Sequence, residues 1–254
     1  MKIYAGTSGY GYKEWKGSFY PEKLPAAEML AYYARRLPAV EINNTFYRMP
    51  SLDAARSWAR QVPREFSFAV KAPQVITHIK RLKYVRQETR YFLSSLKGLG
   101  GKLGAVLFQF PGSFRQDRAR LKAFLALLPP GLPCAFEFRS ASWLNGDTYA
   151  LLSEKGGCLC GADTDEAPLK DLTATAPWGY LRLRRAQYTP ADLAGWAARL
   201  LEQKWDKAYV FFKHEADTAA RGPGFAARLG ALAGAGAGGE KKRPAPLRSR
   251  ALRV

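Results

Sequence analysis

Charged and amide side chains alternate with apolar residues in three short segments of the sequence. In each segment one apolar residue separates two polar ones: Glu41 and Asn43, Glu137 and Arg139, and Arg182 and Arg184. Side chains two residues apart on a strand point to the same face. Carboxylates can act as general acid and base or bind a hard cation, and Lys or Arg side chains bind phosphate and carboxylate groups. The segments therefore predict a site for an anionic substrate.

The residues at these strand ends divide by the chemistry of their side chains. We expect Glu41 and Glu137 to act as catalytic acid and base, and Lys71 and Arg139 to stabilise negative charge. Substrate-binding roles are expected for a larger set of polar and aromatic residues: Ser8, Tyr10, Tyr12, Asn43, Asn44, Tyr47, His78, Gln109, Trp143, Arg182, Arg184 and Lys213. In that set the amides orient the substrate, the aromatic rings offer stacking surfaces for a base or sugar, and His78 can carry a proton.

A structural role for the same charges is the alternative. Glu41 and Glu137 would then be neutralised by three cations in a buried lattice of ion pairs: Lys71, Arg139 and Arg182. Burying an unpaired ion costs several kcal/mol, and a barrel lumen built for stability is filled mainly by Val, Ile and Leu. Because the charges lie at the C-terminal ends of strands, where barrel active sites lie, we favour a functional pocket.

Candidate metal ligands are few. His78 and His214 are the two histidines of the sequence, and Cys158 and Cys160 are interpreted as small buried apolar residues. Any metal would depend mainly on four carboxylates: Glu41, Glu137, Asp163 and Glu215. The cofactor is therefore unknown, and the number of ligands does not support a divalent cation.

Eight apolar or alternating segments of strand length recur along the chain. They cover residues 2–5, 39–43, 66–71, 104–110, 134–138, 157–162, 179–184 and 207–213. Segments with helical periodicity, such as 26–36 and 52–61, separate them, and Ser51 is a candidate N-cap. This alternation favours a closed (β/α)8 barrel, that is, a TIM-barrel-like α/β fold, over an open sheet. Neither GxGxxG after a strand nor GxxxxGK[ST] occurs, which disfavours dinucleotide and P-loop chemistry.

The segment GTSGYGYKEWKGSFYP, residues 6–21, follows the first predicted strand. Its glycine and hydroxyl residues would let the backbone approach an anion closely and donate N–H groups to it. Ser8 does not lie in a GxSxG motif, so the segment does not predict a serine nucleophile. We expect this segment to form part of the pocket.

We predict one domain over residues 1–232, followed by a flexible basic tail over residues 233–254. The chain has a formal charge of +19, and its last fifteen residues hold six basic residues and one acid. Such charge attracts nucleic acid through phosphate contacts without base readout. No run of about eighteen apolar residues and no N-terminal leader is apparent, so we expect a cytoplasmic protein without membrane association. The sequence does not determine the oligomeric state.

Six sequence blocks resemble the YecE-like family, also called domain of unknown function 72. The blocks are GTSGYGYKEWKGSFYP, VEINNTFYRMP, FSFAVKAPQVITHIKRL, LGAVLFQFPGSF, FEFRSASW and AYVFFKHE. The resemblance implies a TIM-barrel-like fold, close to the xylose-isomerase-like and apurinic-endonuclease-like barrels, with a polar pocket and no established activity. Several candidate residues fall within these blocks, without assigned roles: Glu41, Asn43, Lys71, His78, Gln109, Glu137 and Arg139.

One segment departs from the family pattern. The seventh strand of the family usually reads RLHG, whereas here Arg182 and Leu183 are followed by Arg184 and Arg185. If the replaced histidine serves as a metal ligand or proton carrier in the family, this chain lacks it. The substitution weakens a metal mechanism and strengthens anion binding.

Three functions are compatible with these features. The first is a barrel enzyme acting on a phosphate-containing or nucleic-acid substrate, either a hydrolase of the phosphodiesterase or nuclease type or an isomerase-like enzyme. The second is a noncatalytic nucleic-acid-binding protein. The third is an enzyme for a small sugar or carboxylate. The partner is accordingly an anionic small molecule or nucleic acid.

Overall fold

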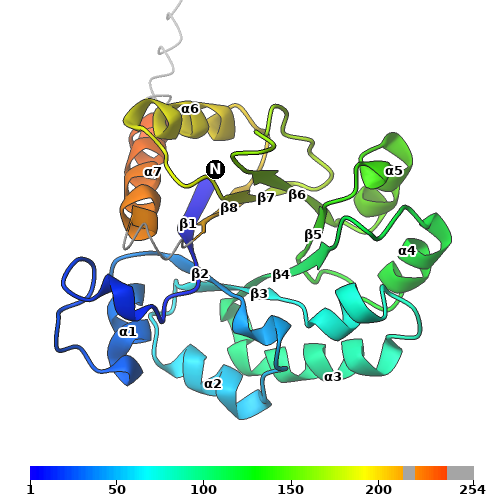
Figure 1. Ribbon diagram of the computed structural model, residues 1–254, viewed down its shortest axis with the longest axis horizontal. Helices are drawn as coiled ribbons and strands as arrows, with labels where there is room; N and C mark the ends of the chain where they lie inside the picture. The colour runs from blue at the N-terminus through cyan, green and yellow to red at the C-terminus, as the bar shows by residue number, and fades with distance from the viewer. Residues whose placement is uncertain (214–220, 239–254) are drawn as a thin grey trace, which may run out of the picture.

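A closed barrel of eight parallel strands forms the centre of the molecule in the computed structural model, which describes residues 1–213 and 221–238 (Figure 1). The strands pair in chain order, and the last pairs with the first. Their bounds are β1 (Lys2–Ser8), β2 (Ala39–Ile42), β3 (Ser67–Lys71), β4 (Leu103–Phe110), β5 (Cys134–Phe138), β6 (Cys158–Asp163), β7 (Trp178–Leu183) and β8 (Lys207–Phe212). The predicted TIM-barrel-like α/β fold is confirmed.

Helices surround this barrel in the part of the chain that the structure describes. They are α1 (Met29–Ala34), α2 (Leu52–Arg60), α3 (Arg86–Leu96), α4 (Arg118–Leu125), α5 (Gly146–Glu154), α6 (Pro190–Leu201) and α7 (Arg221–Gly238). Ser51 caps α2 as predicted, since its Oγ accepts a hydrogen bond from Ala54 N at 3.1 Å. Short helical turns follow four of the strands in the described part of the chain: η1 (Lys13–Trp15), η3 (Asn44–Phe46), η4 (Val75–Ile79) and η6 (Ala141–Trp143). None of the described helices is both long and apolar enough to span a membrane.

The sixth strand–helix unit differs from the expected pattern of eight. Residues 164–177, between β6 and β7, contain no helix and form an irregular loop. Asp163 fixes the start of this loop by accepting a hydrogen bond from Leu169 N at 2.8 Å. Leu169 approaches β6 so closely that a Cβ on Gly161 would lie 2.6 Å from its Cδ2. The loop thus covers the part of β6 that a helix would cover.

Helix α7 extends past residue 232, where we predicted the domain to end. We expected a flexible tail from residue 233, but α7 continues to Gly238, and Ala233 is buried. The helix lies against β1 and beside α6 (Figure 1). Its buried side chains include Ala226, Leu229 and Ala233, which pack toward the barrel. The rest of the predicted tail, residues 239–254, lies outside the described residues.

Small and large side chains fill opposite sides of the barrel lumen. On β2 to β5 the inward residues include four buried alanines: Ala39, Ala69, Ala105 and Ala135. On β1, β7 and β8 they are aromatic: Tyr4, Trp178, Tyr180, Tyr209 and Phe211. Tyr4 and Tyr209 stack at 5.0 Å, and the hydroxyl groups of Ser67 and Tyr209 lie 3.1 Å apart across the lumen. The packed rings fill the lower lumen, and the charged side chains of the lumen lie at the C-terminal strand ends.

Candidate functional site

A buried arginine joins two buried glutamates at the top of the lumen. Arg182 on β7 donates from Nη2 to Oε1 of Glu41 at 3.0 Å and from Nη1 to Oε2 of Glu137 at 2.7 Å. Glu41 is on β2 and Glu137 on β5, and all three side chains are at most 4% exposed. The strand parity predicted from the sequence therefore brings the three together. One guanidinium serves both carboxylates.

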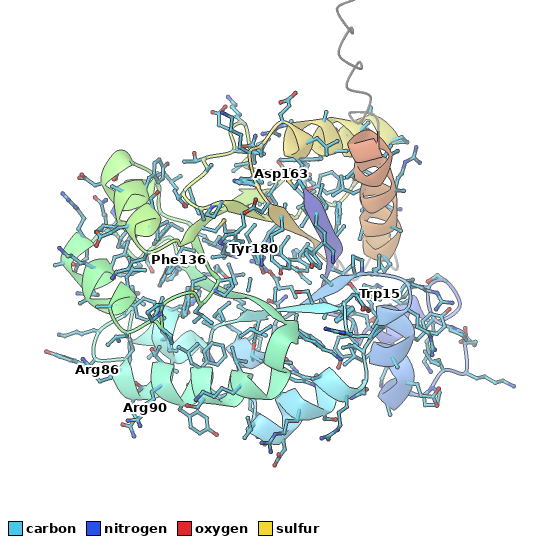
Figure 2. All side chains as sticks on the ribbon, turned by 180° about the vertical axis from the view of Figure 1, so that it is seen from behind. Trp15, Arg86, Arg90, Phe136, Asp163 and Tyr180 are labelled. Atoms are coloured by element: carbon cyan, nitrogen blue, oxygen red, sulfur yellow. The ribbon has the colours of Figure 1, made fainter. Side chains whose placement is uncertain are left out.

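Glu41 accepts three further hydrogen bonds, from side chains on β1, directly after β2, and on β7. Ser8 Oγ lies 2.7 Å and Asn43 Nδ2 lies 3.0 Å from its Oε1, and Tyr180 Oη lies 2.7 Å from its Oε2. Figure 2 shows Tyr180 in the middle of the barrel. Burial alone would raise the pKa of Glu41, but Arg182 and these donors hold it below its usual range. Glu41 is thus a satisfied carboxylate at neutral pH.

Glu137 has a second cation beside it. Arg139, two residues further along the same chain, has its Nε 3.5 Å from Glu137 Oε1, and its side chain is 49% exposed. Burial would raise the pKa of Glu137, but the ion pair with Arg182 outweighs it and lowers the pKa. Arg184 and Arg139 act in the same direction on this pKa. Glu137 is therefore ionised, and Arg139 keeps donors directed to solvent.

Lys71 ends β3 on the same rim of the barrel and is only partly buried. Its Nζ lies 4.0 Å from the centroid of the Phe46 ring, in a cation–π contact. Its carbonyl accepts a hydrogen bond from Thr45 Oγ1 at 2.6 Å, which ties the end of β3 to η3. Burial, and then the charge of Arg182, lower the pKa of Lys71 to about 8. Lys71 therefore exchanges its proton near neutral pH.

His78 lies on η4, beyond the end of β3. Its ring packs edge-on against Phe46 at 4.8 Å, and its Nδ1 lies 2.9 Å from Thr77 Oγ1. Burial and the nearby charge of Lys71 lower the pKa of His78 to about 4. The imidazole is therefore neutral at pH 7, able to donate from one nitrogen and accept at the other.

Three buried polar atoms around the ion pairs have no hydrogen-bond partner among the described residues. They are Gln109 Nε2, Asn43 Oδ1 and Arg182 Nε. Gln109 is 2% exposed, and its position on β4 pairs with that of Glu137 on β5. Buried polar groups normally find a partner, because an unmet one costs about 1–3 kcal/mol. The top of the lumen thus offers donors and an acceptor to a polar molecule.

A cavity of about 770 Å³ opens beside this site, between β5 and β6. These two strands pair at only two positions, Ala135 with Cys158 and Phe136 with Leu159, and separate beyond them. The cavity is lined by Glu137, Arg139 and Arg184 on the barrel side and by the loop of residues 164–173 on the other. Its size suits a small-molecule ligand. The separated strands therefore connect the charged rim to space for a substrate.

The aromatic residues predicted to bind substrate have different environments. Trp143 is a correction: it is fully buried, donates from Nε1 to Phe114 O at 2.7 Å and stacks on Phe138 at 4.7 Å, so its ring faces cannot receive a ligand. Tyr10 and Tyr12 are partly buried against the core. Burial raises the pKa of Tyr12 to about 12, and its hydroxyl donates to Ser8 O at 2.6 Å.

The remaining predicted residues lie around the rim of the barrel or outside the residues that the structure describes. Tyr47 is 78% exposed at the end of η3, and Asn44 is exposed in the same turn. Lys213 directly follows β8, and its N–H donates to Leu183 O at 3.0 Å. His214 and Glu215 lie outside the described residues.

The candidate metal ligands do not come together in the residues that the structure describes. Asp163 points away from the lumen and contacts Arg185 and Tyr188, with Arg185 Nη2 and Tyr188 Oη each 2.9 Å from its carboxylate (Figure 2). Over residues 1–213 and 221–238, no three His, Cys, Asp or Glu side chains are grouped so that they could hold a metal ion. Cys158 and Cys160 are buried in the lumen, as expected.

Sequence reasoning missed two residues and one segment of the site. Tyr180 shares the strand parity of Arg182 and could have been found from it. Phe46, which contacts both Lys71 and His78, gave no signal, because an apolar residue after a strand is usually core. The loop of residues 164–173 could have been noticed, since the segment between β6 and β7 lacks helical periodicity.

The fold and site define a class: a TIM-barrel-like α/β protein with a polar, ion-paired pocket at the C-terminal ends of its strands. The family model described as "Protein of unknown function DUF72" matches residues 4–248. The chain belongs to this family. The resemblance drawn from the six sequence blocks is therefore confirmed, and the family has no established activity.

Curated relatives and solved structures agree with this assignment. The chain is 31% identical over 155 residues to the UPF0759 protein YunF of Bacillus subtilis, a match covering 58% of this chain and 54% of YunF. Over 98 residues it is 31% identical to the UPF0759 protein YecE of Escherichia coli, covering 38% of this chain and 36% of YecE. The matched segments thus span about half or less of these relatives.

A DUF72 family protein from Thermotoga maritima has a similar structure, with a TM-score of 0.77 and 26% identity over 94% of this chain and 100% of that chain. A DUF72 family protein from Enterococcus faecalis, at 20% identity, has a TM-score of 0.76 over 99% of this chain and 100% of that chain. The second shows likeness of fold alone.

Proposed function

We propose that this protein is an enzyme that binds a phosphate-containing substrate at the barrel rim, with Lys71 as the proton-transferring group. The observation that carries this proposal is the balance of charge at the site. At the strand ends two carboxylates, Glu41 and Glu137, lie near four cations, and the loop side of the adjoining cavity adds two acids and one cation. The cations at the strand ends are Lys71, Arg139, Arg182 and Arg184, and the loop residues are Glu166, Asp171 and Lys170. The excess of positive charge favours an anionic ligand.

The purely structural alternative accounts for Arg182 but not for the other cations. Arg182 alone gives each glutamate a close hydrogen-bonded partner, at 3.0 and 2.7 Å. Arg139 is half exposed and only 3.5 Å from one carboxylate oxygen, and Arg184 lines the cavity between β5 and β6. Their guanidinium groups are thus placed to hold a phosphate that enters from this cavity.

The glutamates are unsuited to the acid and base roles that we expected of them. Both have a pKa below the usual range and are at most 4% exposed, so neither gains or loses a proton readily near pH 7. Lys71, with a pKa of about 8, is matched to proton transfer at that pH. In this proposal Glu41 and Glu137 hold Arg182 in place, Glu137 also contacts Arg139, and Lys71 transfers the proton.

A turnover screen tests this function. Purified protein is incubated with a mixture of phosphorylated metabolites, with their dephosphorylated counterparts and with a single-stranded oligonucleotide, and the products are followed by mass spectrometry. We expect turnover of a phosphorylated compound, lost in Lys71→Gln and in the double variant Arg139→Gln/Arg184→Gln. The matched control Arg86→Gln/Arg90→Gln removes two exposed cations from α3 (Figure 2) and should retain turnover. Equal turnover of phosphorylated and dephosphorylated compounds would contradict the proposal.

A nucleic acid is the second candidate ligand, favoured by the exposed residues of the βα loops. Tyr47 is 78% and Tyr84 84% exposed, on the loops after β2 and β3, and Lys83 Nζ lies 5.3 Å from the Tyr84 ring. Exposed aromatic rings next to cations are typical of single-strand binding surfaces. Oligonucleotide binding that falls steeply with salt and is weakened in Tyr47→Ala/Tyr84→Ala, without turnover, would favour this noncatalytic function.

We also propose that the protein works in the cytoplasm. The three cysteines of the chain, Cys134, Cys158 and Cys160, are all free and buried, which suits a reducing compartment. Fractionation of cells that express a tagged chain would test this, and recovery outside the cytoplasmic fraction would contradict it.

A further inference from the structure

Lys71 is held in a defined place at the barrel rim. It is the last residue of β3, and the hydrogen bond from Thr45 Oγ1 to its carbonyl, at 2.6 Å, fixes the backbone at the strand end. The side chain continues over the Phe46 ring, 4.0 Å from its centroid. A residue built on a strand end with such support keeps its reactive atom in place.

The amine of Lys71 has no carboxylate partner in the described part of the chain. No Asp or Glu oxygen there lies within 4.0 Å of Nζ, because Arg182 binds both Glu41 and Glu137. Burial and then the charge of Arg182 oppose the charge of the ammonium, and they outweigh the opposite effect of Glu41 and Glu137. A lysine beside other cations and an apolar surface is the usual environment of a nucleophilic amine.

The lowered pKa of Lys71 increases the fraction of its amine that is uncharged at pH 7. With a pKa of about 8, roughly a tenth of Lys71 is uncharged at pH 7, whereas an ordinary lysine with a pKa of about 10.4 is uncharged in about one molecule in 2,500. Only the uncharged amine attacks a carbonyl carbon. Lys71 therefore offers on the order of a few hundred times more nucleophile than a surface lysine at the same pH.

We propose that Lys71 forms an imine with the carbonyl carbon of a small anionic aldehyde or ketone whose anionic group is held by Arg139 and Arg184. This inference rests on the anion site of the proposed function, gives Lys71 the role of nucleophile in place of proton transfer, and narrows the substrate to carbonyl compounds. The buried Nε2 of Gln109 and Oδ1 of Asn43, which have no partner among the described residues, would meet hydroxyl groups of such a substrate. The 770 Å³ cavity next to Arg139 and Arg184 has room for it.

The step is balanced without oxidant or reductant. The lone pair of Nζ attacks the carbonyl carbon, a C–N bond forms, and the carbonyl oxygen takes up a proton to give a carbinolamine. The nitrogen loses its protons, the C=N bond forms, and the C–O bond breaks to release one water that carries both hydrogens from the amine. His78 packs against the same Phe46 ring that Lys71 Nζ contacts, and its imidazole can carry a proton between nitrogen and oxygen.

Reductive trapping tests the imine directly. The protein is incubated at pH 7 with pyridoxal 5′-phosphate, reduced with borohydride and digested, and labelled lysines are identified by mass spectrometry. We expect label at Lys71 at least ten times more than at Lys122, an exposed lysine on α4 of the same chain. Mapping the wild-type protein makes this result independent of whether any variant folds. Equal labelling of the two lysines would overturn the proposal.

Two comparisons identify the anion and the residues that hold it. Pyridoxal, which lacks the phosphate, and glyoxylate, which carries a carboxylate, are trapped under the same conditions. If one of the two anionic probes, pyridoxal 5′-phosphate or glyoxylate, labels Lys71 faster than the other, the anion that the site prefers is identified. If pyridoxal labels Lys71 as fast as each anionic probe does, the result contradicts an anion site. Arg139→Gln/Arg184→Gln should lower Lys71 labelling at least tenfold, and Arg86→Gln/Arg90→Gln should leave it unchanged.

The failure of this inference can be separated from that of the proposed function. Calorimetry with inorganic phosphate measures anion binding without a carbonyl group. If phosphate binds at Arg139 and Arg184 but Lys71 is not labelled, the imine is wrong and the anion site stands. If phosphate does not bind and no lysine is labelled preferentially, both are wrong.

Discussion

Arg182 and Glu41 form a fully buried ion pair across the barrel, with Nη2 of the arginine 3.0 Å from Oε1 of the glutamate. The same guanidinium binds Glu137 through its other terminal nitrogen. Because Arg182 pairs with both carboxylates, Lys71, Arg184 and the solvent-exposed donors of Arg139 are left for a ligand. The site thus has buried ion pairs between Arg182 and the two glutamates, and more exposed cations at the rim. A substitution should affect stability in the first group and ligand binding in the second.

Replacing Arg182 by Met should destabilise the fold by about 3–5 kcal/mol, because it leaves two buried carboxylates without their cation. Urea unfolding at pH 7 measures the loss. Arg86→Met, at an exposed position on α3, is the control and should change the free energy of unfolding by about 0.5 kcal/mol or less. A cost below about 1 kcal/mol for Arg182→Met would show that the ion pairs are unimportant for stability.

The stability of the fold should fall in acid. The pKa values of Glu41 and Glu137 in the folded state lie below those in the unfolded chain, which are about 4.3. Their contribution is therefore complete above about pH 5 and is lost as pH falls through the folded values. Unfolding curves between pH 7 and pH 3 should show this loss, with a weaker pH dependence in Glu41→Gln/Glu137→Gln. An identical slope in the double variant would contradict the assignment.

Lys71→Met should stabilise the protein by about 1 kcal/mol at pH 7. The folded pKa of about 8 lies below the unfolded value of about 10.4, so below pH 8 the native state bears a charge that its surroundings disfavour. Above pH 8 the wild-type amine loses its proton in the folded state, so the advantage of the variant should shrink towards pH 10. Thermal unfolding at several pH values measures this, and a Lys71→Met protein less stable than wild type at pH 7 would contradict it.

Much of the fold was predictable because its signals are local. Each strand is a short apolar run. Glu41 and Asn43, like Glu137 and Arg139, are separated by one apolar residue, and this spacing indicates which side chains point inward. Closure of the barrel follows from the number of such units. The end of α7 was not predictable in this way, because its Gly and Ala residues give a weak helical pattern and pack through contacts with distant elements.

The pairing within the site depends on three-dimensional contacts that no local pattern contains. Strand parity placed Arg182 in the lumen but could not show that it reaches both glutamates, which lie more than forty residues away in the chain. Burial of Trp143 is likewise a tertiary effect, since its Nε1 donates to Phe114 O, 29 residues earlier in the chain. The residues were thus found from the sequence, and their roles required the structure.

The two aromatic residues Tyr47 and Trp143 should respond oppositely to truncation. Trp143→Ala removes a fully buried ring and should cost about 3–5 kcal/mol in urea unfolding. Tyr47→Ala removes a ring that is 78% exposed and should change stability by about 0.5 kcal/mol or less. If the rim binds single-stranded nucleic acid, Tyr47→Ala should weaken that binding by about tenfold, equivalent to about 1.4 kcal/mol. Tyr47→Ala with wild-type affinity for an oligonucleotide that binds would exclude stacking on this ring.

In the function that we propose, Arg139 and Arg184 hold an anion at the barrel rim. Isothermal titration of the protein with inorganic phosphate, at constant ionic strength and pH 7, tests it most directly. We predict that Arg139→Gln/Arg184→Gln weakens phosphate binding at least tenfold, since each lost charged hydrogen bond is worth about 1.5–3 kcal/mol, and that Arg86→Gln/Arg90→Gln does not. Phosphate affinity that is unchanged in Arg139→Gln/Arg184→Gln and lost in Arg86→Gln/Arg90→Gln would show that the anion binds elsewhere.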